Sequence, residues 1–310
     1  MLRRVEQRLT EAGLLVTAPV AGELVTSLDM AGVSVSLTVL TPRSVKLWLA
    51  PVSAPSFSRP ALDLASLTTN YSLEPETVEL TVRAAPSSAE SRACAETVTA
   101  RAAAAAAAMK RSREELGRLD AIAGDGDHGN GMATGTSAAL AAMRAAVSEA
   151  LGLGTVLMRG GEAWSDVAGG TSGALWGAGL VAAGRALGDT DAPGVGGLAA
   201  AVEAFASEVM RRGDAQPGDK TMVDAIVPFA ERIAEGKSES AGESPSELWM
   251  AAAEAADAAA RATAELQARR GRSRTHGERS IGVADPGATS FALLVRALGG
   301  PGEQDDTCVS

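Results

Sequence analysis

Residues 87–119 read SSAESRACAETVTARAAAAAAAMKRSREELGRL. Alanine has the highest intrinsic helix propensity, so this alanine-rich stretch predicts one long helix. Ser87 and Glu90 have the spacing of a capping box and follow Pro86, which indicates where the helix begins. Because its side chains are small, other helices can pack closely against it, and the stretch therefore predicts a helical domain.

Helical patterns continue along the rest of the chain. Ser244, Pro245 and Glu247 predict a cap, a first-turn proline and a capping-box acid, and Asp285 with Pro286 begins the last helix in the same way. Further helices are predicted near 131–150, 153–167, 171–187, 197–212, 220–236, 244–268 and 285–298. Together with the long first helix they make eight predicted helices. Strand patterns are almost absent and the connections are short, which favours an all-α bundle with antiparallel neighbours.

The first sixty residues have a different pattern. Residues 2–12 predict a short helix, and the alternation of apolar and polar residues over 33–39 predicts a half-buried strand. Residues 44–49 fit either a strand or a helical turn. We therefore predict four segments, which are a small α/β segment at 1–60, a linker rich in Thr, Ser and Pro at 61–87, the helical domain at 88–300 and a tail at 301–310.

The composition excludes several classes of protein. Aromatic residues make up only 3% of the 310 residues, so a core must consist mainly of alanine, leucine and valine. A net charge of −10 repels the phosphates of nucleic acids. No apolar run reaches membrane-spanning length, and no secretion signal is visible. Cys94 and Cys308 show no CxxC pattern, which argues against a disulfide framework or a zinc site. We therefore expect a cytoplasmic protein without a nucleic-acid or membrane partner.

The segment Asp120-Ala-Ile-Ala-Gly-Asp-Gly-Asp-His-Gly129 is the most informative one for chemistry. Its glycines permit sharp turns, so the carboxylates of Asp120, Asp125 and Asp127 can converge. Oxygen ligands without thiolates suit Mg²⁺, and the spacing does not match an EF-hand loop. Asp-Gly-Asp alone is more often a solvated acidic turn, but Asp120, His128 and the later loops together favour a metal site.

Three further loops combine glycine with polar or basic residues. The backbone amides and hydroxyls of residues 169–173, Gly-Gly-Thr-Ser-Gly, could bind an anion at a helix start, although simple helix packing uses the same residues. In 213–222, Lys220 could meet a phosphate and Thr221 could cap the next helix, or the loop is a surface turn. Five arginines within 269–279 could stabilise charge during phosphoryl transfer, or form a solvated basic helix end.

The position of these loops favours one shared site. In an antiparallel bundle alternate loops lie at the same end, so the loops after the first, third, fifth and seventh helices gather at one rim. The turn Asp285-Pro286-Gly287 is a helix cap that could also contact a nucleotide.

Together these residues resemble the nucleotide-binding L domain of dihydroxyacetone (glycerone) kinases over roughly 88–299. Residues 14–55 resemble the end of the substrate-binding K domain of the same family. The resemblance implies a complete L domain, an eight-helix antiparallel barrel, preceded by the C-terminal remnant of K. Its motifs here are Asp120…Gly-Asp-Gly-Asp-His-Gly, Gly-Gly-Thr-Ser-Gly, Pro-Gly-Asp-Lys-Thr-Met, Gly-Glu-Arg-Ser-Ile-Gly and Asp-Pro-Gly-Ala-Thr-Ser in L, and Gly22–Gly32 and Trp48–Pro51 in K.

The resemblance also implies a site. Asp120, Asp125 and Asp127 would hold two Mg²⁺ ions that bridge the phosphates of ATP or ADP. Arg272 would be a catalytic residue. The implied nucleotide pocket consists of His128, Gly129, Asn130, Gly131, Thr171, Ser172, Gly213, Met222, Arg272, Asp285, Pro286 and Gly287.

The activity implied is transfer of the γ-phosphoryl group of ATP to dihydroxyacetone or a related short ketose. The family binds its ketone through a histidine of K, but this sequence contains only His128 and His276, both in the L region. We therefore expect the acceptor site from a partner K domain or subunit, or from upstream sequence. Two alternatives stay open, namely a phosphotransferase-system subunit that keeps ADP bound as a phosphocarrier, and a non-catalytic nucleotide-binding or regulatory module or truncated gene product. A homodimer stays open as an assembly.

Overall fold

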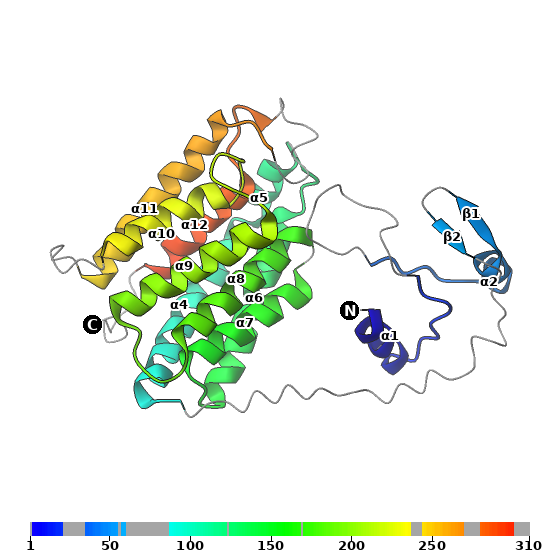
Figure 1. Cartoon of the computed structure of the whole chain (residues 1–310), viewed down its shortest axis with the longest axis horizontal. Coiled ribbons are helices and arrows are strands. Elements are labelled where there is room, and N and C mark those ends of the chain that lie inside the picture. The colour runs from blue at the N-terminus through cyan, green and yellow to red at the C-terminus, as the bar shows by residue number, and fades with distance from the viewer. Residues whose placement is uncertain are drawn as a thin grey trace. The chain divides into compact units, whose positions relative to one another are not determined.

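The structure is a computed structural model that describes residues 2–20, 35–54, 57–59, 87–122, 124–168, 170–236, 244–269 and 280–300. The chain divides into two compact units (Figure 1). One comprises residues 1–28 and 34–81, and the other comprises 29–33 and 82–310. The predicted linker lies outside the described residues apart from Ser87, and the predicted tail lies wholly outside them.

In its described residues the N-terminal unit contains two short helices and one pair of strands. Its elements are α1 (Leu2–Glu11), α2 (Pro42–Leu49), β1 (Val52–Ala54) and β2 (Phe57–Arg59), with the two strands antiparallel.

The ambiguous segment at 44–49 is helical. The Thr41 hydroxyl accepts from the Ser44 N–H at 3.2 Å, and Pro42 occupies the first turn. The strand predicted over 33–39 is wrong in its described part, because residues 35–40 have no regular structure. Val39 is 94% exposed and no described segment pairs with it, and an isolated strand is not stable in water.

The second unit is helical throughout its described part. Its helices are α4 (Ala89–Arg111), α5 (Arg113–Asp120), α6 (His128–Ser148), α7 (Leu153–Val167), α8 (Gly170–Leu187), α9 (Gly194–Gly213), α10 (Val223–Glu235), α11 (Pro245–Ala262), the 3₁₀ turn η1 (Thr263–Glu265) and α12 (Pro286–Leu298).

These helices form the predicted eight-membered antiparallel barrel. The long first helix is interrupted at Ser112, where the backbone leaves helical geometry, so α4 and α5 together form one member. Around the ring α4 packs on α6, and α6 to α12 pack each on the next. Helix α12 then packs back on α4 and closes the ring (Figure 1). Among the described residues no helix is both long and apolar enough to cross a membrane.

A few aromatic side chains fill the centre of a core that otherwise consists of alanine together with leucine, valine, isoleucine and methionine. Trp176 stacks on Trp164 with ring centroids 5.0 Å apart, and Phe205 meets Trp176 edge-on at 5.5 Å. Phe291 of α12 lies 5.9 Å from Trp176 and 5.6 Å from Phe229. Large rings that touch several helices at once let a chain poor in aromatic residues define one arrangement of its helices.

Caps fix where the helices begin. The predicted capping box of α11 is present, since Ser244 N donates to Glu247 Oε2 at 2.8 Å and Glu247 N donates to Ser244 Oγ at 3.2 Å. Asp285 caps α12 through a 2.7 Å bond from Ala288 N. For α4 the cap is Ser88 and not Ser87, whose hydroxyl donates to the carbonyl of Ala150.

Candidate functional site

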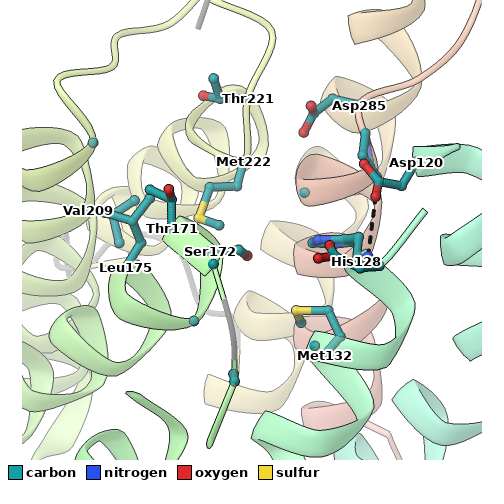
Figure 2. Close-up of a pocket in the computed structure, with 18 of the residues that line it drawn as sticks. Asp120, His128, Met132, Thr171, Ser172, Leu175, Val209, Thr221, Met222 and Asp285 are labelled. Atoms are coloured by element: carbon teal, nitrogen blue, oxygen red, sulfur yellow. Dashed lines mark hydrogen bonds between the residues drawn. The ribbon is translucent and has the colours of Figure 1, made fainter. Parts of the chain in front are cut away.

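A cavity of about 450 Å³ opens at the rim of the helical unit. It lies between the loop after α5 and the first turns of α6, α8, α10 and α12. Figure 2 shows Asp120, His128 and Asp285 on one side of it, facing Thr171 and Met222 on the other. The rim therefore brings together three of the four loops that the antiparallel order predicted, whereas the fourth, 269–279, lies outside the described residues apart from Arg269.

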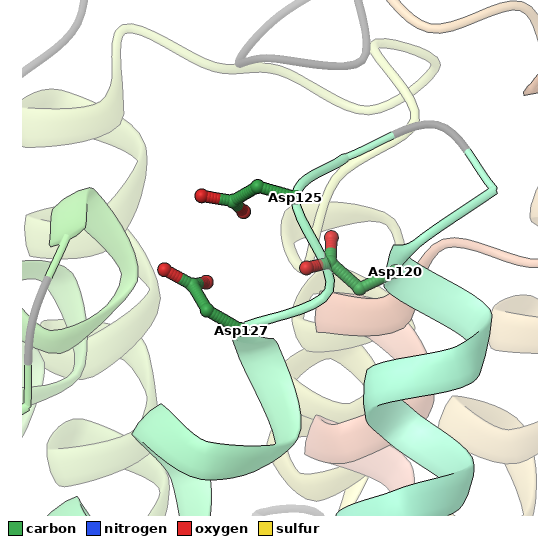
Figure 3. A group of neighbouring side chains, drawn as sticks. All are labelled: Asp120, Asp125 and Asp127. Carbon is green, nitrogen blue, oxygen red and sulfur yellow. The ribbon is translucent and has the colours of Figure 1, made fainter.

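Three carboxylates converge at this cavity. Asp120 ends α5, Asp125 lies in the following loop and Asp127 precedes α6. One carboxylate oxygen of each lies within 4.8 Å of those of the other two (Figure 3). Burial and the neighbouring Asp120 raise the pKa of Asp127, because each opposes a further negative charge. Carboxylate oxygens without thiolates suit a hard divalent cation such as Mg²⁺, which would relieve this repulsion.

The glycines of this loop have specific tasks. Gly126 has a backbone φ of +78°, a conformation that residues other than glycine rarely adopt. A Cβ at Gly124 would lie 2.3 Å from Asp120 Oδ1, so any larger residue would displace a carboxylate of the cluster. The glycines of the loop therefore determine which positions the carboxylates can occupy.

His128 joins two walls of the cavity. Its backbone N–H donates to Asp120 Oδ2 at 3.3 Å, the bond drawn in Figure 2. Its Nε2 lies 2.9 Å from the Ser290 hydroxyl of α12. Burial lowers the pKa of His128, while Asp120 acts in the opposite direction. His128 thus fixes the start of α6 to α12 beside the carboxylates.

The start of α8 is suited to an anion. Thr171 and Ser172 lie in its first turn, where backbone N–H groups are free of helix partners. The Ser172 hydroxyl is buried and has no hydrogen-bond partner within the described part of the protein. Because a buried hydroxyl without a partner is costly, this group fits a ligand oxygen such as that of a phosphate.

The prediction that Lys220 could meet a phosphate is not supported. Its ammonium lies within hydrogen-bond distance of four backbone carbonyls, those of Thr263, Leu266, Ser280 and Val283. Lys220 lines the cavity, but its donors point into the protein.

The cap predicted at Thr221 is formed only in part, because the N-cap of α10 is Met222 and Thr221 precedes it. The Thr221 hydroxyl accepts from Val223 N at 3.2 Å at the start of α10.

The turn before α12 presents a partly buried carboxyl. Asp285 receives the N–H of Ala288, and its own N–H donates to the Thr263 hydroxyl at 2.7 Å. Burial raises the pKa of Asp285 to about 7, which the N–H groups of Ala288 and Gly287 and the Lys220 ammonium partly oppose. The Asp285 carboxyl is thus held rigidly at the cavity wall.

Comparison with known proteins identifies the family. Residues 122–300 match the DAK2 domain and residues 1–56 match the Dak1 domain. The chain belongs to the dihydroxyacetone kinase family. It is 44% identical over 300 residues to L-erythrulose 1-kinase of Mycolicibacterium smegmatis, covering 96% of this chain and 51% of that protein.

A further relative is a separate subunit that matches only part of this chain's length. The chain is 37% identical over 185 residues to the ADP-binding subunit DhaL of the PEP-dependent dihydroxyacetone kinase of Escherichia coli, covering 60% of this chain and 86% of that subunit.

The dihydroxyacetone kinase from C. freundii in complex with AMP-PNP and Mg²⁺ has the same fold, with a TM-score of 0.51 and 23% identity over 84% of this chain and 42% of that one. This member of the family spans about half the length of the erythrulose kinases that it matches.

Within this dihydroxyacetone kinase family member, the cavity contains most residues predicted for the site. They are Asp120, Asp125, Asp127, His128, Asn130, Gly131, Thr171, Ser172, Gly213, Met222, Asp285, Pro286 and Gly287. Gly129 is not among the lining residues, because it packs on the backbone of Arg113 in α5. Arg272 lies outside the described residues.

The apolar wall of the cavity was not predicted. It includes Met132, Trp164, Val167, Leu175, Val209 and Val223. These residues lie in or beside helices, where an apolar pattern indicates burial but not which buried face borders a cavity. One signal could have indicated this wall. Several polar loops lie at the same end of the bundle, so the helix ends that adjoin them are expected to line the same site.

Proposed function

We propose that this chain supplies the Mg–ATP half of a kinase that phosphorylates short ketoses. One observation carries the proposal, namely that three converging carboxylates share a cavity with the buried Ser172 hydroxyl at the start of α8, for which the described part of the chain offers no hydrogen-bond partner. A cation-binding cluster opposite an anion-binding helix start is the arrangement that a metal-bound polyphosphate requires.

The roles proposed for the residues follow from the chemistry of phosphoryl transfer, which depends mainly on positioning and charge stabilisation. Asp120, Asp125 and Asp127 would hold Mg²⁺, with two ions as the proposed number. When bound, Mg²⁺ neutralises charge on the phosphates. The amides and hydroxyls of Thr171 and Ser172 would orient phosphate oxygens, and the apolar wall would accept the nucleoside. Arg272 would add positive charge beside the transferred group.

The acceptor is proposed to be dihydroxyacetone or a four-carbon ketose such as erythrulose. Three relatives that match nearly the whole chain are named erythrulose kinases, and they extend over about twice its length. Both histidines of the chain occur from residue 128 onward, outside the part that matches the Dak1 domain. We therefore propose that a K domain or K subunit supplies the ketose site.

The match to DhaL favours a second candidate, a subunit that keeps ADP bound as a phosphocarrier, since the chain covers 86% of that ADP-binding subunit. Nucleotide exchange separates the two functions. An ATP-dependent kinase half releases nucleotide during dialysis, whereas a phosphocarrier retains ADP.

The kinase proposal is tested by an assay that contains ATP, Mg²⁺ and dihydroxyacetone, L-erythrulose or D-erythrulose. Production of ADP is measured with and without an added K subunit. We expect ketose-dependent ADP production only when the K subunit is present. If a K subunit that is active with its own L partner gives no ketose-dependent turnover with this chain, the proposal fails.

Ser172→Ala is expected to lower Mg–nucleotide affinity about tenfold, or about 1.4 kcal/mol, because it removes a buried hydroxyl that has no partner among the described residues and would bond the ligand. The Tm should stay unchanged or rise, since a buried unpartnered group is removed. Thr99→Val is the matched control, because Thr99 Oγ1 is also buried without a partner in the described structure but does not line the cavity. Calorimetric titration with Mg–ADP measures the difference, and equal affinities of the two variants would count against the role of Ser172.

A further inference from the structure

Lys220 is a buried cation surrounded by backbone. The residue as a whole is only 5% exposed to solvent. The Nζ atom lies 2.8 Å from Thr263 O, 3.0 Å from Leu266 O, 2.5 Å from Ser280 O and 2.7 Å from Val283 O. An ammonium has three N–H donors, so these four carbonyls occupy all of them. No donor remains for a phosphate.

The position of Lys220 is energetically demanding. Its backbone has φ +62°, in the left-handed region that a lysine rarely adopts. Burial lowers the pKa of its ammonium, and the nearby charges of Asp285 and Asp224 oppose that effect. The start of α10 does not require this lysine, because Thr221 and Asp224 already receive backbone N–H groups there. Strain of this kind persists where surrounding bonds fix it, and it is concentrated at functional sites.

The four carbonyls belong to two segments that do not line the cavity themselves but bond to Lys220 and Asp285, which do. Thr263 and Leu266 lie in and after η1, while Ser280 and Val283 precede α12. The segments also bond each other directly, since Gly282 N donates to Ala264 O at 2.8 Å. The Lys220 ammonium therefore bridges both segments at their point of contact.

Thr263 connects this bridge to the cavity. Its carbonyl accepts from Lys220, and its hydroxyl accepts the N–H of Asp285 at 2.7 Å. Asp285 and Gly287 line the cavity at the start of α12. A displacement of Thr263 would thus move the turn that faces the proposed nucleotide.

We propose that Lys220 is a positioning residue of the nucleotide pocket, whose ammonium serves as a fixed internal cation that holds η1 and residues 280–283 together and so places the Asp285–Gly287 turn. That the pocket binds a nucleotide rests on the proposed function. The bridge between the two segments does not rest on it, because it consists only of contacts within the protein.

Hydrogen exchange tests the bridge without any ligand. Lys220→Met removes the charge and keeps the length of the side chain. We expect faster exchange of the amides of Leu266, Gly282 and Asp285, with unchanged exchange in α4. Lys110→Met, at an exposed position of α4, is the control. It should leave the exchange of the three amides unchanged. Unchanged exchange at all three amides of Lys220→Met would overturn the bridge.

Chemical rescue tests whether positive charge at this point positions the pocket. Lys220→Ala should bind Mg–ADP at least roughly tenfold more weakly than the wild type. Addition of n-propylammonium chloride should restore most of the affinity, whereas n-propanol or sodium chloride at equal concentration should not. Equal affinity of Lys220→Ala and wild type, or rescue by n-propanol as well, would overturn the proposal.

The two proposals fail in different ways. If the wild type does not bind Mg–ADP, the proposed function is wrong, and the exchange of the three amides still decides the role of Lys220. If Lys220→Met does not fold, refolding of Lys220→Ala decides instead. Recovery with n-propylammonium but not with n-propanol supports the internal cation, and recovery with neither or with both contradicts it.

Discussion

Replacement of Asp125 by alanine is expected to weaken Mg²⁺-dependent nucleotide binding by at least about a hundredfold, because it removes one of three converging metal-binding carboxylates. The side chain is exposed in a loop, so the helical core does not depend on it. Helix content should therefore stay the same. In the absence of metal the Tm should be unchanged or slightly higher, since repulsion within the carboxylate cluster is relieved.

Calorimetric titration with Mg–ADP measures this loss, and circular dichroism measures helix content. Glu231→Ala is a matched control, since Glu231 is an exposed acid on α10 that does not line the cavity. It should bind like the wild type. An Asp125→Ala variant with unchanged nucleotide affinity would remove the basis for a metal site at this cluster.

Gly129→Ala is expected to cost about 3 kcal/mol of unfolding free energy, near the upper end of the effect of overpacking. A Cβ at this position would lie 1.9 Å from the carbonyl oxygen of Arg113, and backbone cannot yield as a flexible side chain can. Helix α6 must then move away from α5 at the point where Asp127 and His128 enter the cavity. We therefore expect loss of nucleotide affinity together with the loss of stability.

Gly131→Ala provides the comparison within the same helix. A Cβ there meets nothing within 4 Å, so only the helix propensity of alanine acts. This variant should be stabilised by about 0.5–1 kcal/mol. Urea denaturation measures both free energies. If the two variants have equal stability, the close contact between α5 and α6 is not a determinant of the fold.

Most of the helical fold was predictable because its signals are local. Alanine-rich segments, the capping box at Ser244 and the Asp285-Pro286 start each determine a helix without reference to distant residues. The strand predicted around Val35–Val39 failed for the opposite reason, since alternation cannot show whether a neighbouring strand exists. The break at Ser112 was also not predicted, because serine is common within helices.

The polar half of the site was predictable and the apolar half was not. Glycine, aspartate and serine in loops indicate chemistry, and alternate loops of an antiparallel barrel lie at one end. Trp164 and Val209 resemble ordinary core residues in the sequence, and only the packing of the helices shows that they border a cavity. For Lys220 the sequence showed a cation near a proposed phosphate site. Its contacts with four carbonyls depend on residues more than forty positions away.

The most direct test of the account is calorimetric titration of the purified chain with AMP-PNP, first with Mg²⁺ and then with EDTA. We predict saturable binding of one nucleotide per chain with Mg²⁺ and a loss of affinity of at least about a hundredfold with EDTA. Equal binding under both conditions, or no binding with Mg²⁺, would contradict a metal-dependent nucleotide site formed by Asp120, Asp125 and Asp127.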